Sequence, residues 1–319
     1  MIIVAHTHAL CPEVNGLVAI PDAHNIPPES AEVDRAQFPV LGQHFNDIAA
    51  RRADMATMGV THQLPIPAPG QQHYWAEPEL LARLSRLQNA HVAKMVAADP
   101  DIFSGLGTLP MTAPEPAVAE ATHAVETLNL RFFQIDTHAD AMELSDPALD
   151  PLCARLVKPH VPLVMHPPGF SDGARLGAPY MVNTVGNPLE EVIAANHLIL
   201  GGVLDRHPGL RVKIVHGGGF FPFLIGRLDL AWKRLLEIHR LAAEALSAHL
   251  KCLCYDTVVL QPRLLRELFE PVRPGRIMLG SGYPFTWARR RRATLAASGI
   301  PPRGNATIES GAAEAFFRI

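Results

Sequence analysis

Histidines are the residues of this sequence that are best suited to chemistry. The chain has 16 of them among 319 residues. Two, His6 and His8, directly follow the apolar run Ile2–Ala5 and are separated by one residue. Side chains two apart on a strand point to the same face, so both imidazoles can approach one ion. The pair therefore predicts part of a metal site, although a lone pair of this kind is also common in structural positions.

Two further histidines follow other apolar runs. His166 comes directly after Val161–Met165, and His216 comes directly after Arg211–Val215 and before three glycines. Neutral imidazoles are good ligands for zinc, iron and manganese ions. Three protein ligands with one open position are typical of a catalytic metal site. A fourth histidine that does not bind the ion can transfer protons near neutral pH. The residues alone leave open which of the four are ligands.

Short apolar runs alternate with segments of helical periodicity along the whole chain. The predicted strands are Ile2–Ala5, Gly59–Leu64, Phe103–Leu109, Arg131–Ile135, Val161–Met165, Arg211–Val215, Cys252–Tyr255 and Arg276–Leu279. The predicted helices are Phe45–Met58, Glu77–Ala98, Pro114–Asn129, Leu149–Lys158, Leu189–His207, Phe223–Ala248 and Gln261–Glu270. Strands that alternate with helices imply a parallel sheet with right-handed crossovers.

Eight such units predict an α/β fold, a (β/α)₈ TIM barrel that forms one domain over residues 1–319. An open doubly wound sheet is the alternative, but no glycine-rich phosphate loop follows the first strand. Catalytic residues of such barrels lie at the carboxyl ends of the strands, where His6, His8, His166 and His216 are expected. Residues 11–43 are polar and rich in proline. They are predicted to form a small insertion after the first strand that caps the barrel mouth.

Composition excludes several classes of protein. Apolar residues make up 48% and charged residues only 18%, below the usual quarter, which indicates a folded domain with a large core and not a disordered chain. The net charge of −3 indicates no nucleic-acid partner. No apolar run approaches the roughly 18 residues of a membrane span. The first residues show no secretion signal, so we expect a cytoplasmic protein. Four cysteines do not indicate a disulfide framework.

A series of motifs along the chain gives a more specific indication. They are His6-Thr-His8, Tyr74-Trp-Ala-x-Pro-Glu79, Gly105-Leu-Gly-Thr-Leu-Pro-Met111, Gln134-Ile-Asp-Thr-His138, Val164-Met-His-Pro167, Val185-Gly-Asn-Pro188, Gly201-Gly-Val-Leu204, His216-Gly-Gly-Gly-Phe220, Gly226-Arg227 and Ile277-Met-Leu-Gly-Ser-Gly-Tyr-Pro-Phe285. With these motifs the chain resembles the amidohydrolase superfamily, and within it the branch of 2-amino-3-carboxymuconate-6-semialdehyde decarboxylase. The resemblance extends from about residue 2 to residue 317.

The resemblance implies a role for each of five residues. His6, His8 and His166 match the metal ligands of the family, and we expect one divalent ion, with zinc as the first choice. His216 matches the catalytic histidine. Arg227 matches an arginine that reaches the site of a neighbouring subunit and binds a substrate carboxylate, so a homodimer is expected. A guanidinium suits this task because it binds a carboxylate through two parallel hydrogen bonds.

The implied activity is metal-dependent, non-oxidative decarboxylation, which is carbon–carbon lyase chemistry, of a small unsaturated or aromatic carboxylic acid. A metal-dependent hydrolase or hydratase of the same superfamily is the alternative, because it would use the same residues. A second alternative is a catalytically impaired homologue that only binds a ligand or partner.

The second alternative is motivated by Gly282. The family has a metal-binding aspartate at this position, and glycine has no side chain to coordinate an ion. The ion is then bound more weakly with an extra water, or another carboxylate such as Asp256 replaces the aspartate, or the protein is impaired. We expect Asp256 to be a structural hydrogen-bonding residue. A substrate-binding arginine of the family is also missing at Phe38-Pro-Val-Leu41.

Overall fold

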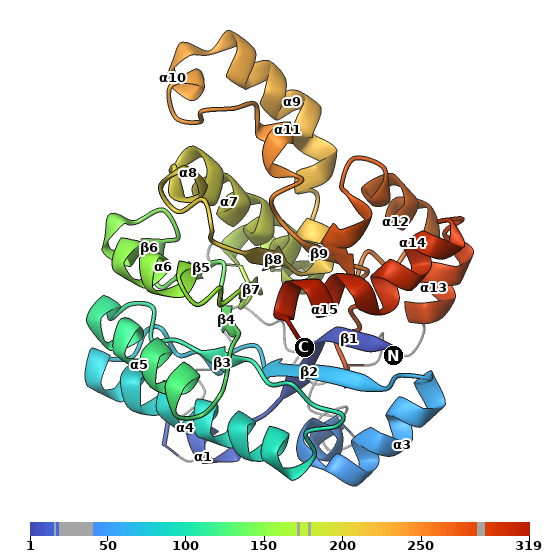
Figure 1. The fold of residues 1–319 in the computed structure, drawn as a ribbon. Coiled ribbons are helices and arrows are strands. Elements are labelled where there is room, and N and C mark those ends of the chain that lie inside the picture. The colour runs from blue at the N-terminus through green and yellow to red at the C-terminus, as the bar shows by residue number, and fades with distance from the viewer. Residues whose placement is uncertain (16, 19–40, 171–172, 178–179, 286–290) are drawn as a thin grey trace.

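The computed structural model describes residues 1–15, 17–18, 41–170, 173–177, 180–285 and 291–319 (Figure 1). Eight parallel strands form its centre. They are β1 (Ile3–Ala9), β2 (His62–Pro67), β3 (Gly107–Thr108), β4 (Phe133–Ile135), β7 (Leu163–Met165), β8 (Val212–Ile214), β9 (Tyr255–Asp256) and β10 (Ile277–Met278). All eight predicted strands are confirmed within a few residues of their predicted bounds.

The strands close into a barrel. Regular pairing forms three groups of strands. The first is β1 and β2, the second is β3, β4, β7 and β8 in that order, and the third is β9 and β10. Single parallel bridges join these groups to one another: Gln63 with Phe103, Lys213 with Cys254, and Thr7 with Tyr283. The last bridge links the first and last strands, which completes the ring. The predicted (β/α)₈ barrel is therefore confirmed, and the open sheet is excluded.

Helices surround the barrel (Figure 1). They are α1 (Pro12–Asn15), α3 (Ile48–Met58), α4 (Pro78–Ala98), α5 (Pro114–Glu126), α6 (Asp150–Val157), α7 (Asn187–Leu200), α8 (Val203–Arg206), α9 (Phe221–Arg234), α10 (Leu236–His239), α11 (Leu246–His249), α12 (Pro262–Phe269), α13 (Arg291–Ala297), α14 (Pro302–Ala306) and α15 (Ala312–Phe317). A short antiparallel hairpin of β5 (His138–Ala139) and β6 (Met142–Glu143) follows β4.

Two of the predicted helices are interrupted. The predicted Leu189–His207 helix ends at Leu200, because Gly202 adopts a left-handed conformation with φ of 70°. The predicted Phe223–Ala248 helix divides into α9, α10 and α11, which project from the barrel as an arm at the top of Figure 1. We call this segment, residues 221–249, the α9–α11 arm.

Apolar side chains from all eight strands or their immediate neighbours fill the barrel. They form one cluster with the last helix, α15: Ile3, Ala5, Leu64, Ile66, Leu106, Phe132, Val164, Val215, Cys254, Met278, Ala312, Ala313, Phe316 and Phe317. A larger cluster lies between the strands and the surrounding helices. The filled interior places any binding site at the barrel mouth and not along its axis.

Most of the predicted insertion over residues 11–43 lies outside the described residues, which include only α1 and a few neighbouring positions. Its role as a cap, and the single-domain boundary of 1–319, stay predictions. None of the helices in the described ranges is long and apolar enough to cross a membrane.

Candidate active site

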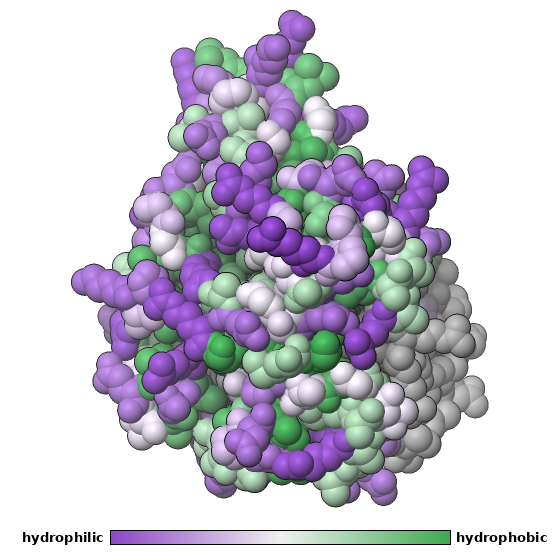
Figure 2. All heavy atoms as spheres, turned by 45° about the vertical axis from the view of Figure 1, so that its right-hand side comes forward, coloured by the Kyte–Doolittle hydropathy of each residue, from purple (hydrophilic) through white to green (hydrophobic). Residues whose placement is uncertain are grey.

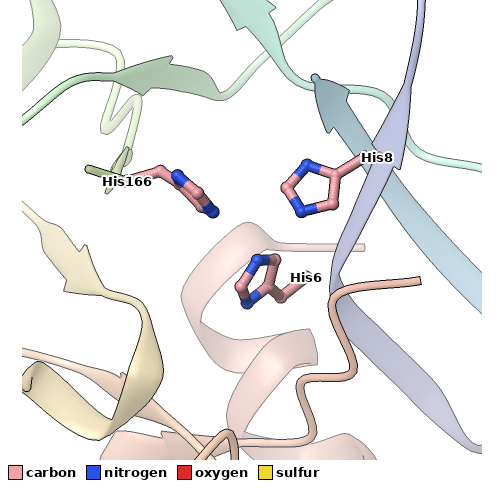
Figure 3. A group of neighbouring side chains, drawn as sticks. All are labelled: His6, His8 and His166. Atoms are coloured by element: carbon pink, nitrogen blue, oxygen red, sulfur yellow. The ribbon is translucent and has the colours of Figure 1, made fainter. Parts of the chain in front are cut away.

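Three histidines from two strands converge at the barrel mouth (Figure 3). His6 and His8 lie on β1, and His166 directly follows β7. Their ring centroids are 5.1–5.2 Å apart, and one ligand atom from each ring lies within 4.8 Å of the others. Figure 3 shows the three rings turned toward a common space. The predicted trio is therefore brought together as expected.

Both histidines of β1 point into the barrel because the strand is irregular. Ile3 and Ala5 pack in the barrel interior, whereas Val4 and Ala9 pack on the outer side. Strict alternation from Ile3 and Ala5 would turn His6 and His8 outward. The register between β1 and β2 shifts between Val4 and Thr7, so the phase of the side chains changes there. Local backbone irregularity thus creates the site.

The three histidines are almost completely buried, with at most 4% of each side chain exposed. Burial lowers the pKa of His6 to about 4, although the Asp256 carboxylate opposes this shift. Burial, followed by the charges of neighbouring histidines, holds the pKa values of His8 and His166 well below the usual value. All three rings are neutral at pH 7, and neutral imidazole is the form that binds metal ions.

The donor set fits one divalent ion of the zinc or manganese type. Nε2 of His6 and Nδ1 of His8 are buried and have no hydrogen-bond partner among the described residues. Nδ1 of His166 lies 2.9 Å from the backbone oxygen of Pro167, which orients that ring. Buried nitrogens without partners are costly, and a metal ion would satisfy them.

Asp256 orients His6 and does not belong to the metal-ligating group. Its carboxylate accepts a hydrogen bond from Nδ1 of His6 at 2.9 Å, which leaves Nε2 for an ion. It also accepts from the backbone of Val258 at 3.0 Å, and Nζ of Lys213 lies 3.5 Å away. Burial alone would raise the pKa of Asp256, but Lys213 and His6 bring it well below its usual range. The structural role expected for Asp256 is the one that its contacts support.

We expect Asp256→Asn to weaken metal binding by about ten- to a hundred-fold, because the change removes the charge that fixes the tautomer and orientation of His6. It should also destabilise the fold by about 3–5 kcal/mol, because the buried Lys213 ammonium loses its counter-ion. Metal competition with a chelator and chemical denaturation measure the two effects.

The double variant Asp256→Asn/Lys213→Met separates them. It should recover stability but not metal affinity. Recovery of both would show that Asp256 acts only by neutralising Lys213.

His216 stands beside the trio but outside it. Its ring centroid is 5.4 Å from that of His6 and 5.2 Å from that of His166. Nδ1 of His216 lies 2.5 Å from a carboxylate oxygen of Glu191, which is fully buried. Burial alone would lower the pKa of His216, but the charge and hydrogen bond of Glu191 raise it above its usual value. The pair is suited to holding a proton and delivering it.

A glycine allows Glu191 to reach His216. Gly219 has φ of 60°, and a Cβ at this position would lie 2.3 Å from the backbone oxygen of Pro188 and 3.0 Å from Oε2 of Glu191. Only glycine therefore lets the start of α7 pack against the turn after β8. The three glycines after His216 therefore form the turn and also allow α7 to pack closely against it.

The eighth strand has no carboxylate at the expected position, because the residue there is Gly282. The backbone N–H of Gly282 donates to the backbone oxygen of His6 at 3.0 Å, and its φ is 69°. Gly282 thus lies directly beside the strand that carries the first two histidines. No carboxylate joins the three-histidine group in the part of the chain that the structure describes.

Two arginines have different environments. Arg51 is fully buried and donates to the backbone oxygens of Phe45 and His8 and to the side chain of Gln63. Its donors support β1, so it is a structural residue. Arg227 is exposed on α9, and no hydrogen bond or ion pair to it is found within the described ranges. Its place on the projecting α9–α11 arm leaves it available to a partner.

The comparison with known proteins agrees with this geometry. The amidohydrolase family matches residues 5–319. The chain belongs to the amidohydrolase family. Among the relatives of this amidohydrolase, 2-amino-3-carboxymuconate-6-semialdehyde decarboxylase of Dictyostelium discoideum is 30% identical over 259 residues, which cover 79% of this chain and 72% of the relative. The predicted resemblance to that branch is confirmed.

Solved structures show the same fold for this amidohydrolase. The 5-carboxyvanillate decarboxylase of Sphingomonas paucimobilis superimposes with a TM-score of 0.88 at 26% identity, covering 100% of this chain and 99% of the other. A dihydroxybenzoic acid decarboxylase of Polaromonas, solved with bound manganese, superimposes with a TM-score of 0.85 at 20% identity, covering 99% and 96%.

Sequence reasoning missed Glu191 and Lys213 in this amidohydrolase. Both are fully buried charged residues next to apolar ones: Glu191 follows Glu190 and precedes Val192, and Lys213 lies between Val212 and Ile214. A charge in such a segment is almost always paired, so it was an available signal. Its partner could not be named from the sequence, because Glu191 and His216 are 25 residues apart.

Proposed function

We propose that the protein is a metal-dependent, non-oxidative decarboxylase of a small aromatic or unsaturated carboxylic acid. The observation that carries the proposal is a buried trio of histidines beside His216, whose Nδ1 lies 2.5 Å from the buried carboxylate of Glu191. The names of the relatives, all of them decarboxylases in the comparisons above, support the same chemistry.

Decarboxylation requires what this site provides. The bond between the substrate carbon and its carboxylate breaks, carbon dioxide leaves, and the electron pair stays on the carbon. That carbon must then receive a proton, and His216 is placed to donate it while Glu191 stabilises the charged imidazolium. His6, His8 and His166 would hold a divalent ion, which would supply positive charge to bind and polarise a substrate oxygen.

Zinc is our first choice for the ion, and manganese is the alternative because a structural relative contains it. The three imidazoles suit either ion. Elemental analysis of the purified protein, followed by reconstitution of the metal-free protein with each ion, distinguishes them. We also propose a cytoplasmic location.

The activity is tested directly by measuring carbon dioxide released from a panel of hydroxybenzoates and unsaturated dicarboxylic acids. We expect release that stops on chelation and returns on addition of metal. Hydrolysis of an ester or amide panel without carbon dioxide would favour the hydrolase alternative. A metal-loaded protein that is inactive on all panels would favour the impaired homologue, for which Gly282 is the motivation.

We further propose that the protein acts as a homodimer in which Arg227 binds the substrate carboxylate in the partner's site. Exposed large apolar residues gather on the α9–α11 arm: Phe223, Leu230, Leu235, Leu236 and Leu241. In Figure 2, hydrophobic residues lie among hydrophilic ones on this projection. An arm with exposed apolar side chains is suited to contact a second subunit.

We expect Arg227→Ala and His216→Asn homodimers to be nearly inactive, and mixed dimers of the two to recover activity. In a mixed dimer one site has both His216 and the Arg227 of the other subunit. Carbon dioxide release after subunits are exchanged, with each variant alone as control, measures this. No recovery in mixed dimers of proven composition would mean that Arg227 does not act across an interface.

A further inference from the structure

A second group of potential metal ligands lies outside the three-histidine site. It consists of Cys11, Glu13 and His91, and one ligand atom of each lies within 4.8 Å of the others. Sγ of Cys11 is 3.3 Å from Oε2 of Glu13, and Nδ1 of His91 is 3.6 Å from the same oxygen. Cys11 and Glu13 flank the start of α1, and His91 lies on α4. We call it the Cys11 group.

Side-chain amides hold the Cys11 group in place. Gln71 accepts from the backbone N–H of Cys11 at 2.9 Å and donates to its backbone oxygen at 3.0 Å. Asn46 forms the same pair of hydrogen bonds with Leu10: it accepts from the backbone N–H at 3.2 Å and donates to the backbone oxygen at 2.6 Å. The thiol therefore projects from backbone that is fixed on both sides. Such preorganisation reduces the entropy lost when an ion binds.

His91 is oriented with Nδ1 toward the carboxylate of Glu13, at 3.6 Å. Oδ1 of Asn46 accepts from the backbone of Leu10 and lies 3.4 Å from Nε2 of His91, which favours the tautomer with the proton on Nε2. In the neutral ring the lone pair is then on Nδ1, which faces the Glu13 carboxylate. Burial lowers the pKa of His91, which favours this neutral form. Two acceptors face each other there. The exposed Lys94 is close enough for its charge to act on both, but it forms no ion pair with either in the described ranges.

The group does not have the properties of a catalytic thiol. The thiol donates to the weakly basic Glu13 carboxylate and not to the histidine, so no imidazole base is placed to activate it. Burial raises the pKa of Cys11 to about 11, which opposes thiolate formation in the absence of a cation. Sulfur, imidazole and carboxylate together are instead the ligand types that zinc accepts.

We infer that Cys11, Glu13 and His91 form a second zinc site, which ties the segment after β1 to α4. Binding releases the thiol proton of Cys11 to solvent, and the sulfur bonds to the ion. With thiolate and carboxylate, a divalent ion makes a neutral site. Because 56% of the Glu13 side chain is exposed, water can take the fourth position. The site begins three residues after His8, so a bound ion would fix the chain that leaves β1 at the barrel mouth against α4.

Cobalt titration of the metal-free protein tests the inference. A thiolate bound to Co²⁺ gives an intense charge-transfer band in the near ultraviolet, and the three-histidine site has no sulfur to produce one. We expect the wild-type protein to bind about two ions per chain, one of which produces the band. Cys11→Ser should abolish the band while one ion per chain still binds at the histidines. Cys153→Ser, the matched variant of a buried cysteine on α6, should keep it.

Absence of the band in the wild-type protein, or its persistence in Cys11→Ser, would overturn the inference. If Cys11→Ser does not fold, the exposed Glu13→Gln replaces it, and its band should require at least about tenfold more cobalt. An unchanged titration for Glu13→Gln would equally count against the site. The readout needs no catalysis, so it is independent of the proposed decarboxylase activity.

Discussion

Replacement of His216 by asparagine is expected to lower kcat by about 10²–10⁴-fold while the metal content stays unchanged. The loss is of the size that removal of a general acid or base produces. His216 lies outside the group of three ligands, so the ion should remain. Asparagine is the suitable replacement because φ at this position is 48°, a conformation that asparagine tolerates better than alanine does. Steady-state kinetics and elemental analysis of the same preparation measure both quantities.

Glu191→Gln provides the matched control. If His216 donates the proton, activity falls as the pH rises through the pKa of His216. The Glu191 charge raises that pKa, so its removal should move the alkaline limb of the rate profile to lower pH. Loss of metal from His216→Asn would instead identify His216 as a ligand. An alkaline limb that does not move would mean that another group delivers the proton.

The second large effect is expected from Gly282→Asp. This change returns a carboxylate to the eighth strand, and we expect metal affinity to rise by about ten- to a hundred-fold, the range by which residues of metal sites commonly alter affinity. The backbone N–H of Gly282 is hydrogen-bonded to the backbone oxygen of His6, so the new side chain would begin close to the three histidines. Its φ of 69° strains aspartate less than most other residues, because aspartate is among the few that adopt left-handed backbone. Competition with a chelator measures the affinity.

Gly282→Asn has the same shape and backbone tolerance but no charge, so it should gain much less affinity. Equal gains in both variants would show that the carboxylate charge is not the cause. No gain for Gly282→Asp would mean that another group already occupies the fourth position. Combining Gly282→Asp with Asp256→Asn then asks whether the new carboxylate compensates for the weakened support of His6.

Much of the fold was available from local patterns. The strands were predicted because a buried parallel strand is a short apolar run, and each run ends where the barrel mouth begins. Helix ends were less predictable. The break after Leu200 depends on the left-handed backbone of Gly202, and the division of the α9–α11 arm follows no signal in the apolar periodicity.

The sequence by itself determined the barrel, its order of units and the identity of the histidines at its mouth, because strand periodicity and strand ends are local properties. The resemblance of its motifs indicated the family and the missing carboxylate at Gly282. Only the tertiary structure decided which groups support those histidines. Asp256 lies 250 residues from His6, and Glu191 reaches His216 only across the gap that Gly219 leaves open. Contacts between distant segments depend on how the barrel closes and where one strand shifts register, and no local pattern encodes either.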